Sequence, residues 1–143
     1  MTRRAFLVVL FVASLSGCQS SQERPPQIRY GRDVCAQCGM IISEARFAAA
    51  YITKRGDWRL FDDIGDMLGF YKVHGEAVAV FWVHDYEREE WLKAAGAFFV
   101  KSSALHTPMG HGIVALSSRE RAEQLVRQVQ GQLFTFTELL NAR

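Results

Sequence analysis

Three sulfur-bearing residues lie close together in the stretch CAQCGM, residues 35–40. Cys35 and Cys38 are three residues apart, and Met40 follows Cys38 by two. Such a group could form a redox-active disulfide, a corner of a zinc site or a site for a softer metal. The ligand types favour the last use, because thiolate and thioether sulfur are soft donors that select Cu(I).

Other metal centres require ligands that this stretch does not offer. Structural zinc usually takes four Cys or His ligands, and methionine is a poor ligand for it. Haem attachment needs a histidine directly after Cys38, where Gly39 stands, and an iron–sulfur cluster normally takes four cysteines, whereas the chain has three. A structural disulfide or a thiol oxidoreductase that uses Cys35 and Cys38 remains an alternative. A thioredoxin-type enzyme would place the pair at the start of a helix, but a β-rich stretch follows here.

The backbone conformation decides which sulfur atoms can converge. In an extended segment, residues two apart point to the same face, about 7 Å apart along the strand. Cys38 and Met40 would then share a face, with no side chain at Gly39 between them. Cys35 and Cys38 converge only if the chain turns at residues 36 and 37.

A second group of soft ligands occurs in HTPMGH, residues 106–111. Met109 and His111 again stand two apart around a glycine, and Pro108 stiffens the approach. Thioether and imidazole both suit copper, so Met109 is a candidate third ligand and His111 a further one. The stretch FDDIG, residues 61–65, is typical of a helix N-cap, although a carboxylate near a metal is an alternative.

The order of apolar and polar segments predicts an α+β fold of two ββαβ repeats packed together. The first unit is expected to contain strands 46–53 and 58–61, a helix from Asp62 and a buried strand 77–83. The second is expected to contain strands 97–101 and 112–116, followed by a helix that begins with a capping box at residues 117–120 and ends at Gly131. A strand 133–136 and a final helical turn 137–141 are expected to complete it. The halves are about 28–84 and 92–143 of a domain 28–143, and the segment between them is expected to hold a short helix.

The N-terminus has the features of an export signal, residues 1–17. Arg3 and Arg4 precede an apolar run at 5–13 that is too short to span a bilayer. Residues 15–18, Leu-Ser-Gly-Cys, resemble the lipobox of bacterial lipoproteins, which implies cleavage before Cys18 and its acylation. Residues 18–27 are polar and contain proline, so we interpret them as a lipidated tether. Gln19 follows the cysteine, which favours a periplasm-facing anchor in the outer membrane.

Charge and motif content exclude several classes of function. The sequence has 17 Lys and Arg and 15 Asp and Glu, and removal of the signal with Arg3 and Arg4 would leave 15 of each. No basic run that could follow a phosphate backbone occurs. We therefore expect no nucleic-acid partner. No nucleotide loop, Ser-His-Asp arrangement or pair of catalytic carboxylates stands out, and we expect a binding protein rather than an enzyme.

The ordered set of motifs resembles the NosL family of copper-binding accessory lipoproteins of nitrous oxide reductase. The resemblance is carried by the lipobox, by Cys-x-x-Cys-Gly-Met at 35–40, by Phe-Asp-Asp at 61–63 and by Thr-Pro-Met-Gly at 107–110. It covers essentially the whole chain after Cys18.

The resemblance implies a Cu(I) chaperone that works with nitrous oxide reductase and its copper-centre maturation transporter complex. It implies that Cys38 and Met40 bind copper, with Met109 or Cys35 as further ligands. It also implies a fold related to part of organomercurial lyase. Delivery of copper to another cuproenzyme is the alternative for the client.

Overall fold

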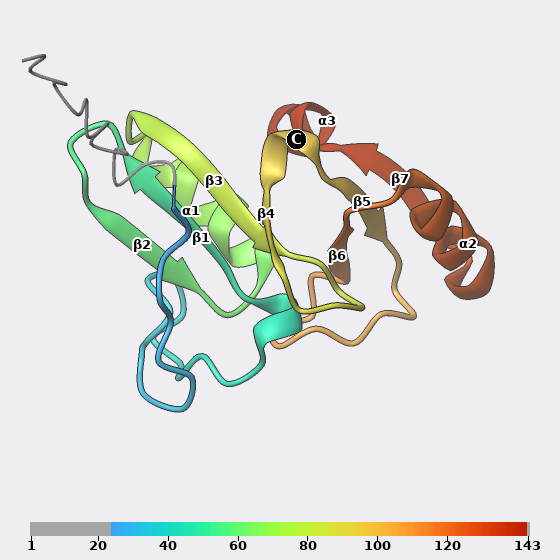
Figure 1. Ribbon diagram of the computed structural model, residues 1–143, viewed down its shortest axis with the longest axis horizontal. Helices are drawn as coiled ribbons and strands as arrows, with labels where there is room; N and C mark the ends of the chain where they lie inside the picture. Colours follow the sequence, from blue (N-terminus) through green and yellow to red (C-terminus); the bar gives the residue numbers. More distant parts are fainter. Residues whose placement is uncertain (1–23, 143) are drawn as a thin grey trace, which may run out of the picture.

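Two antiparallel sheets and three α-helices make up the structure, which is a computed structural model describing residues 24–142 (Figure 1). The predicted signal segment 1–17, the lipidation site Cys18 and most of the predicted tether lie outside the described residues. No helix within 24–142 is long and apolar enough to cross a membrane.

The same ββαβ unit occurs twice along the chain. The first consists of β1 (Ala49–Thr53), β2 (Trp58–Phe61), α1 (Ile64–His74) and β3 (Val78–His84). The second consists of β5 (Phe98–Lys101), β6 (Ile113–Leu116), α2 (Arg119–Val129) and β7 (Gln132–Thr135), and α3 (Phe136–Asn141) follows. The strand orders are β2-β1-β3-β4 and β6-β5-β7, so each unit places its first strand between the other two. This arrangement confirms the predicted repeat.

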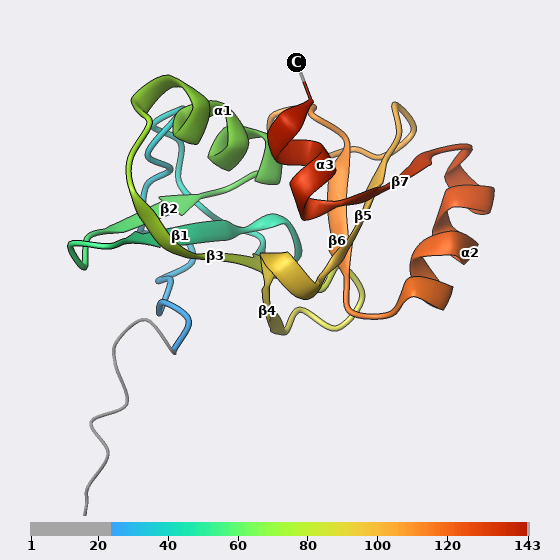
Figure 2. The ribbon, with the colours of Figure 1, turned by 90° about the horizontal axis from the view of Figure 1, so that it is seen from above.

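An aromatic cluster joins α1 to the first sheet, one face of which the helix covers (Figure 2). Tyr51 at the centre of β1 is fully buried, and its ring lies 5.5–5.6 Å from those of Phe61 and Phe81. Phe70 and Tyr71 of α1 contact the same tyrosine at 6.5 Å. Such tilted and edge-to-face pairs add stability beyond the apolar area they bury.

The cores of the two units are continuous through α3. Phe136, at the start of this helix, lies 5.0 Å from Phe81 of β3 and 5.7 Å from Phe99 of β5, measured between ring centroids. A second cluster of buried side chains lies between α2 and its sheet, and includes Val100, Leu116 and Leu125. Neither unit therefore buries its apolar surface by itself.

Asp85 forms a polar junction between the units. It follows β3, is 3% exposed, and forms a parallel bridge with Ala115 of β6. One carboxylate oxygen accepts hydrogen bonds from the amide and hydroxyl of Ser117, at 2.8 and 2.7 Å. The other accepts from the amides of Glu87 and Arg88, at 2.9 Å each.

Two predicted element starts are wrong. The strand expected at 46–53 begins at Ala49, because Ala45–Phe47 form a turn of 3-10 helix. The capping box expected at 117–120 does not form: the N-cap is Ser118, which accepts from the Arg121 amide at 3.3 Å, because Ser117 is held by Asp85. Adjacent serines cannot be ranked as caps from spacing alone, since tertiary contacts select between them.

The remaining elements differ from prediction in detail. Gln130, with φ of 51°, occupies the left-handed C-cap position of α2 that was expected to involve Gly131, and β7 begins at Gln132. The segment between the units contains a short strand, β4 (Trp91–Lys93), that was not expected. A single 3-10 turn, Ala94–Gly96, replaces the expected helix.

Glu76, before β3, is predicted to contribute stability that depends on pH. It accepts from the hydroxyl of Tyr51 and pairs with Arg59 at 2.6 Å, and both hydrogen bonds hold its pKa below the ordinary value of 4.5. A lowered folded-state pKa stabilises the protein above the unfolded pKa, and this stabilisation is lost as pH falls through the folded value. We expect Glu76→Gln to lower the free energy of unfolding by about 1–2 kcal/mol at pH 7, and by less below pH 4.

Denaturant unfolding at pH 7 and at pH 3.5 checks this prediction. Glu44→Gln is the matched control, because Glu44 is exposed. A loss in Glu76→Gln that is equal at both pH values would contradict the assigned ionic role.

Candidate metal site

The two cysteines lie on a short β-hairpin that precedes β1. Its arms are joined by hydrogen bonds from Ile42 N to Asp33 O at 2.9 Å and from Cys35 N to Met40 O at 2.8 Å. The tip is closed by a bond from Gly39 N to Cys35 O at 3.0 Å. Gly39 has a φ of 75°, in the left-handed region that glycine adopts without strain. The turn at 36–38 therefore forms, and it brings the two thiols to one side of the hairpin.

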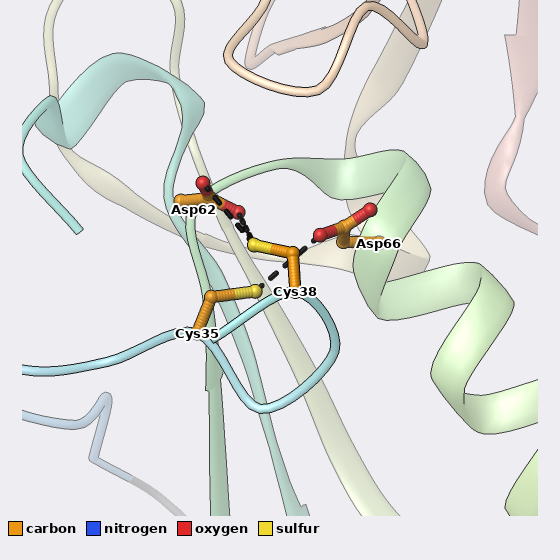
Figure 3. Close-up of side chains that lie close together, drawn as sticks. All are labelled: Cys35, Cys38, Asp62 and Asp66. Atoms are coloured by element: carbon orange, nitrogen blue, oxygen red, sulfur yellow. Dashed lines mark hydrogen bonds between the residues drawn. The ribbon is translucent and has the colours of Figure 1, made fainter. Parts of the chain in front are cut away.

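The thiols face two carboxylates at the start of α1 (Figure 3). Cys35 Sγ lies 3.4 Å from Asp66 Oδ2, and Cys38 Sγ lies 3.6 Å from Asp62 Oδ1. One ligand atom from each of these four residues lies within 4.8 Å of the other three. Cys35 is 2% exposed and both aspartates are 4% exposed, whereas Cys38 is half-buried. Cys38 is thus the thiol that solvent reaches.

Local sequence explains how the carboxylates reach the thiols. Asp66 lies in the first turn of α1, whereas Asp62 comes between the end of β2 and the N-cap residue Asp63, so the two carboxylates approach the thiols from either side of the N-cap. The hairpin is tied to β2, the strand that leads into α1, by a hydrogen bond from Ala36 N to Leu60 O at 2.8 Å. The hairpin and the helix start are therefore held against each other.

Both cysteines are free thiols, and the site favours their protonated form. Burial raises the pKa of Cys35 strongly. Burial also raises the pKa of Cys38, and the negative charge of Asp62 adds to this effect. Each thiol hydrogen bonds to a carboxylate oxygen. A bound cation would reverse this balance, because it stabilises thiolates beside carboxylates.

The second group of soft ligands is attached to the same helix start. Asp63 is the N-cap of α1: one oxygen accepts from Gly65 N at 2.8 Å and the other from Met109 N at 3.0 Å. His111 Nε2 lies 3.0 Å from Asp66 Oδ1, so this carboxylate contacts both Cys35 and His111. The three aspartates thus bring the loop 106–111 beside the cysteine hairpin.

The structure brings together part of the predicted ligand set. Cys35 and Cys38 converge, and the backbone of Met109 is hydrogen-bonded to Asp63, the neighbour of Asp62. The side chains of Met40 and Met109 are 55% and 37% exposed, and their coordination of a metal stays a prediction. The extended conformation considered for residues 38–40 is wrong, because Gly39 adopts a positive φ.

Sequence reasoning undervalued the carboxylates. The N-cap interpretation of FDDIG is confirmed, but only for Asp63. Asp62 was considered only as an alternative metal neighbour, and Asp66 was not singled out at all. Asp66 gave no separate signal, because an acidic residue in the first turn of a helix is common through its favourable charge against the helix dipole.

Comparison with known proteins agrees with this fold. The NosL family model matches residues 28–142. The copper-binding lipoprotein NosL of Stutzerimonas stutzeri is 25% identical over an alignment of 147 residues, gaps included, that covers 93% of this chain and 77% of that protein. The crystal structure of the copper chaperone NosL from Shewanella denitrificans matches with a TM-score of 0.73 and 26% identity, over 83% of this chain and 100% of that chain. Because the family model spans nearly all the described residues, the chain belongs to the NosL family.

Proposed function

We propose that this protein is a Cu(I) carrier and not an enzyme, with copper as its cargo. The observation that carries the proposal is the convergence of two thiols within 4.8 Å on a partly exposed hairpin turn. Two metal–sulfur bonds of about 2.3 Å span about 4.6 Å, so an ion between the thiols can contact both sulfur atoms after at most a small adjustment of the hairpin. The names of the two relatives, a copper-binding lipoprotein and a copper chaperone, support the same cargo.

The donor set fits a soft monovalent ion. Cys38 and Met40, with Met109 or Cys35, offer thiolate and thioether sulfur, which select Cu(I) over harder ions. Asp62 and Asp66 are hard donors, and we assign them to orienting the thiols through the hydrogen bonds described above. Because Cys38 is only half-buried, the site is open to solvent at this thiol, which suits a carrier that hands copper over by ligand exchange.

The thiol oxidoreductase alternative is less well supported. Reactive cysteines have lowered pKa values in electropositive surroundings. Here burial raises the pKa of both thiols, and carboxylates face them. A thiol in this setting is a poor nucleophile, whereas metal binding supplies the positive charge that ionises it.

We further propose a location and a client from the sequence and the family. Acylation at Cys18 would anchor the domain to a membrane, where it would face the periplasm. Gln19, the residue after the acylated cysteine, favours the outer membrane. The name of the Stutzerimonas stutzeri relative, a lipoprotein, supports the anchor. The proposed recipients are nitrous oxide reductase and its copper-centre maturation transporter complex, with another cuproenzyme as the alternative.

Anaerobic titration of the reduced lipoprotein, solubilised in detergent, tests the cargo. In competition with a Cu(I)-specific chelator, we expect one tightly bound copper per chain. We expect X-ray absorption of the loaded protein to show copper–sulfur scattering. Failure to compete with the chelator, or copper bound only by nitrogen and oxygen, would remove the carrier proposal.

A further inference from the structure

The methionines of this chain differ sharply in exposure. Met67 of α1 is 0% exposed, whereas the side chains of Met40 and Met109 both reach solvent. The remaining methionine, Met1, belongs to the predicted signal segment. A thioether is oxidised to a sulfoxide by peroxides, and the reagent must reach the side chain from solvent. Met40 and Met109 are therefore the methionines that an oxidant can attack in the folded domain.

Both exposed methionines stand next to a glycine in open space. Met40 follows Gly39, which has a φ of 75° at the tip of the cysteine hairpin. Met109 precedes Gly110, whose amide donates to the carbonyl of Thr107 at 3.0 Å and closes a turn. A Cβ atom added to either glycine would meet no atom within 4 Å, its chain neighbours apart. No other part of the described chain covers these glycines, in agreement with the exposure of the methionine beside each.

Oxidation changes the donor that each methionine offers. A thioether is apolar and has a soft sulfur donor, whereas a sulfoxide is polar and carries a hard oxygen. Hydrogen peroxide transfers one oxygen atom to the sulfur, which loses two electrons, and the remainder of the peroxide leaves as water. The sulfur lone pair that would bind Cu(I) is then used in the new sulfur–oxygen bond.

We propose that Met40 and Met109 are oxidation sites at which a peroxide switches off copper binding. The inference rests on the proposed function, because their oxidation affects the cargo only if these thioethers help to hold it. A methionine sulfoxide reductase reverses the step: the oxygen leaves as water while two thiols of the reductant form a disulfide. Copper binding is thereby lost under peroxide and regained after enzymatic repair.

The test must separate methionine oxidation from cysteine oxidation. The reduced, copper-free lipoprotein in detergent is treated with hydrogen peroxide, and peptide mass spectrometry locates each added oxygen atom. A thiol reductant is then added, which restores Cys35 and Cys38 from a disulfide or sulfenic acid but leaves methionine sulfoxide in place. Competition with a Cu(I)-specific chelator measures the affinity before and after treatment, and circular dichroism checks that the fold is retained.

We expect sulfoxide at Met40 and Met109, none at Met67, and an unchanged fold. The Cu(I) affinity of the oxidised protein should fall by about tenfold or more, as for loss of a supporting ligand. Methionine sulfoxide reductases of both stereospecificities should restore it. The matched control is the double variant Met40→Leu, Met109→Leu, whose lower starting affinity should not respond to peroxide.

Three results would overturn the proposal. They are an unchanged Cu(I) affinity after both methionines are oxidised, resistance of both methionines to peroxide, and an equal loss of affinity in the double variant. The last result would place the sensitive group elsewhere in the chain. Failure of the untreated protein to bind copper would instead refute the proposed function.

Discussion

Cys38→Ser is expected to lower the Cu(I) affinity by at least about 100-fold, more than loss of an outer-shell partner costs. Cys38 is the half-buried thiol of the site, and serine replaces its soft sulfur with a hard oxygen of similar size. Cys35→Ser is expected to cost less, about tenfold, because Met40 and Met109 remain to complete the site. A thiol oxidoreductase predicts the opposite pattern, in which either substitution abolishes activity.

Methionine substitutions provide the matched comparison for thioether binding. Met40→Leu, at an exposed thioether, is expected to weaken Cu(I) binding by about tenfold, in the range seen for supporting ligands. Met67→Leu changes a fully buried methionine of α1 and should leave the affinity unchanged. Competition with a Cu(I)-specific chelator measures all four variants. Wild-type affinity in both Cys38→Ser and Met40→Leu would show that the proposed site is wrong.

Asp85→Asn is expected to lower the free energy of unfolding by about 3 kcal/mol at pH 7, because an ionised acceptor of several hydrogen bonds is lost. The carboxylate accepts four, two of them from Ser117 across the junction between the units. An asparagine would turn one of these acceptors into a donor that faces N–H groups. The unfolding temperature should fall by roughly 10 °C, as expected for a domain of this size.

The contribution of Asp85 depends on pH in a defined direction. Burial alone would raise its pKa, but the hydrogen bonds from Ser117, Arg88 and Glu87 outweigh burial and hold the pKa below the ordinary value. The contribution is therefore present above the unfolded pKa of about 3.9 and is lost as pH falls through the folded value. Wild type and Asp85→Asn should converge in stability under acid conditions.

Thermal unfolding across this pH range checks the junction. Asp57→Asn is the charge-matched control, because the side chain of Asp57 is 50% exposed and should tolerate the change. Ser117→Ala removes one of the four hydrogen bonds and should cost about 1 kcal/mol. Equal stability of Asp85→Asn and Asp57→Asn at pH 7 would contradict the structural role of Asp85.

Most of the fold could be predicted because local patterns specify it. The alternation and length of apolar runs identified all six repeat strands, and the strand Trp58–Phe61 was predicted with the correct bounds. Errors occurred where a tertiary contact competes with a local preference. Ser117 could not serve as the predicted cap because Asp85, far away in the sequence, accepts its hydrogen bonds.

The soft character of the site was determined by the sequence alone, because residue type sets which metal a sulfur atom prefers. Two cysteines and a methionine within six residues, and Met109 with His111 in a second segment, were sufficient to predict copper chemistry. Only the tertiary structure showed that Asp62 and Asp66 face the thiols, with Asp66 also contacting His111. That placement depends on the packing of the cysteine hairpin against the start of α1. The hairpin and the helix start are joined by long-range contacts, which no local sequence pattern encodes.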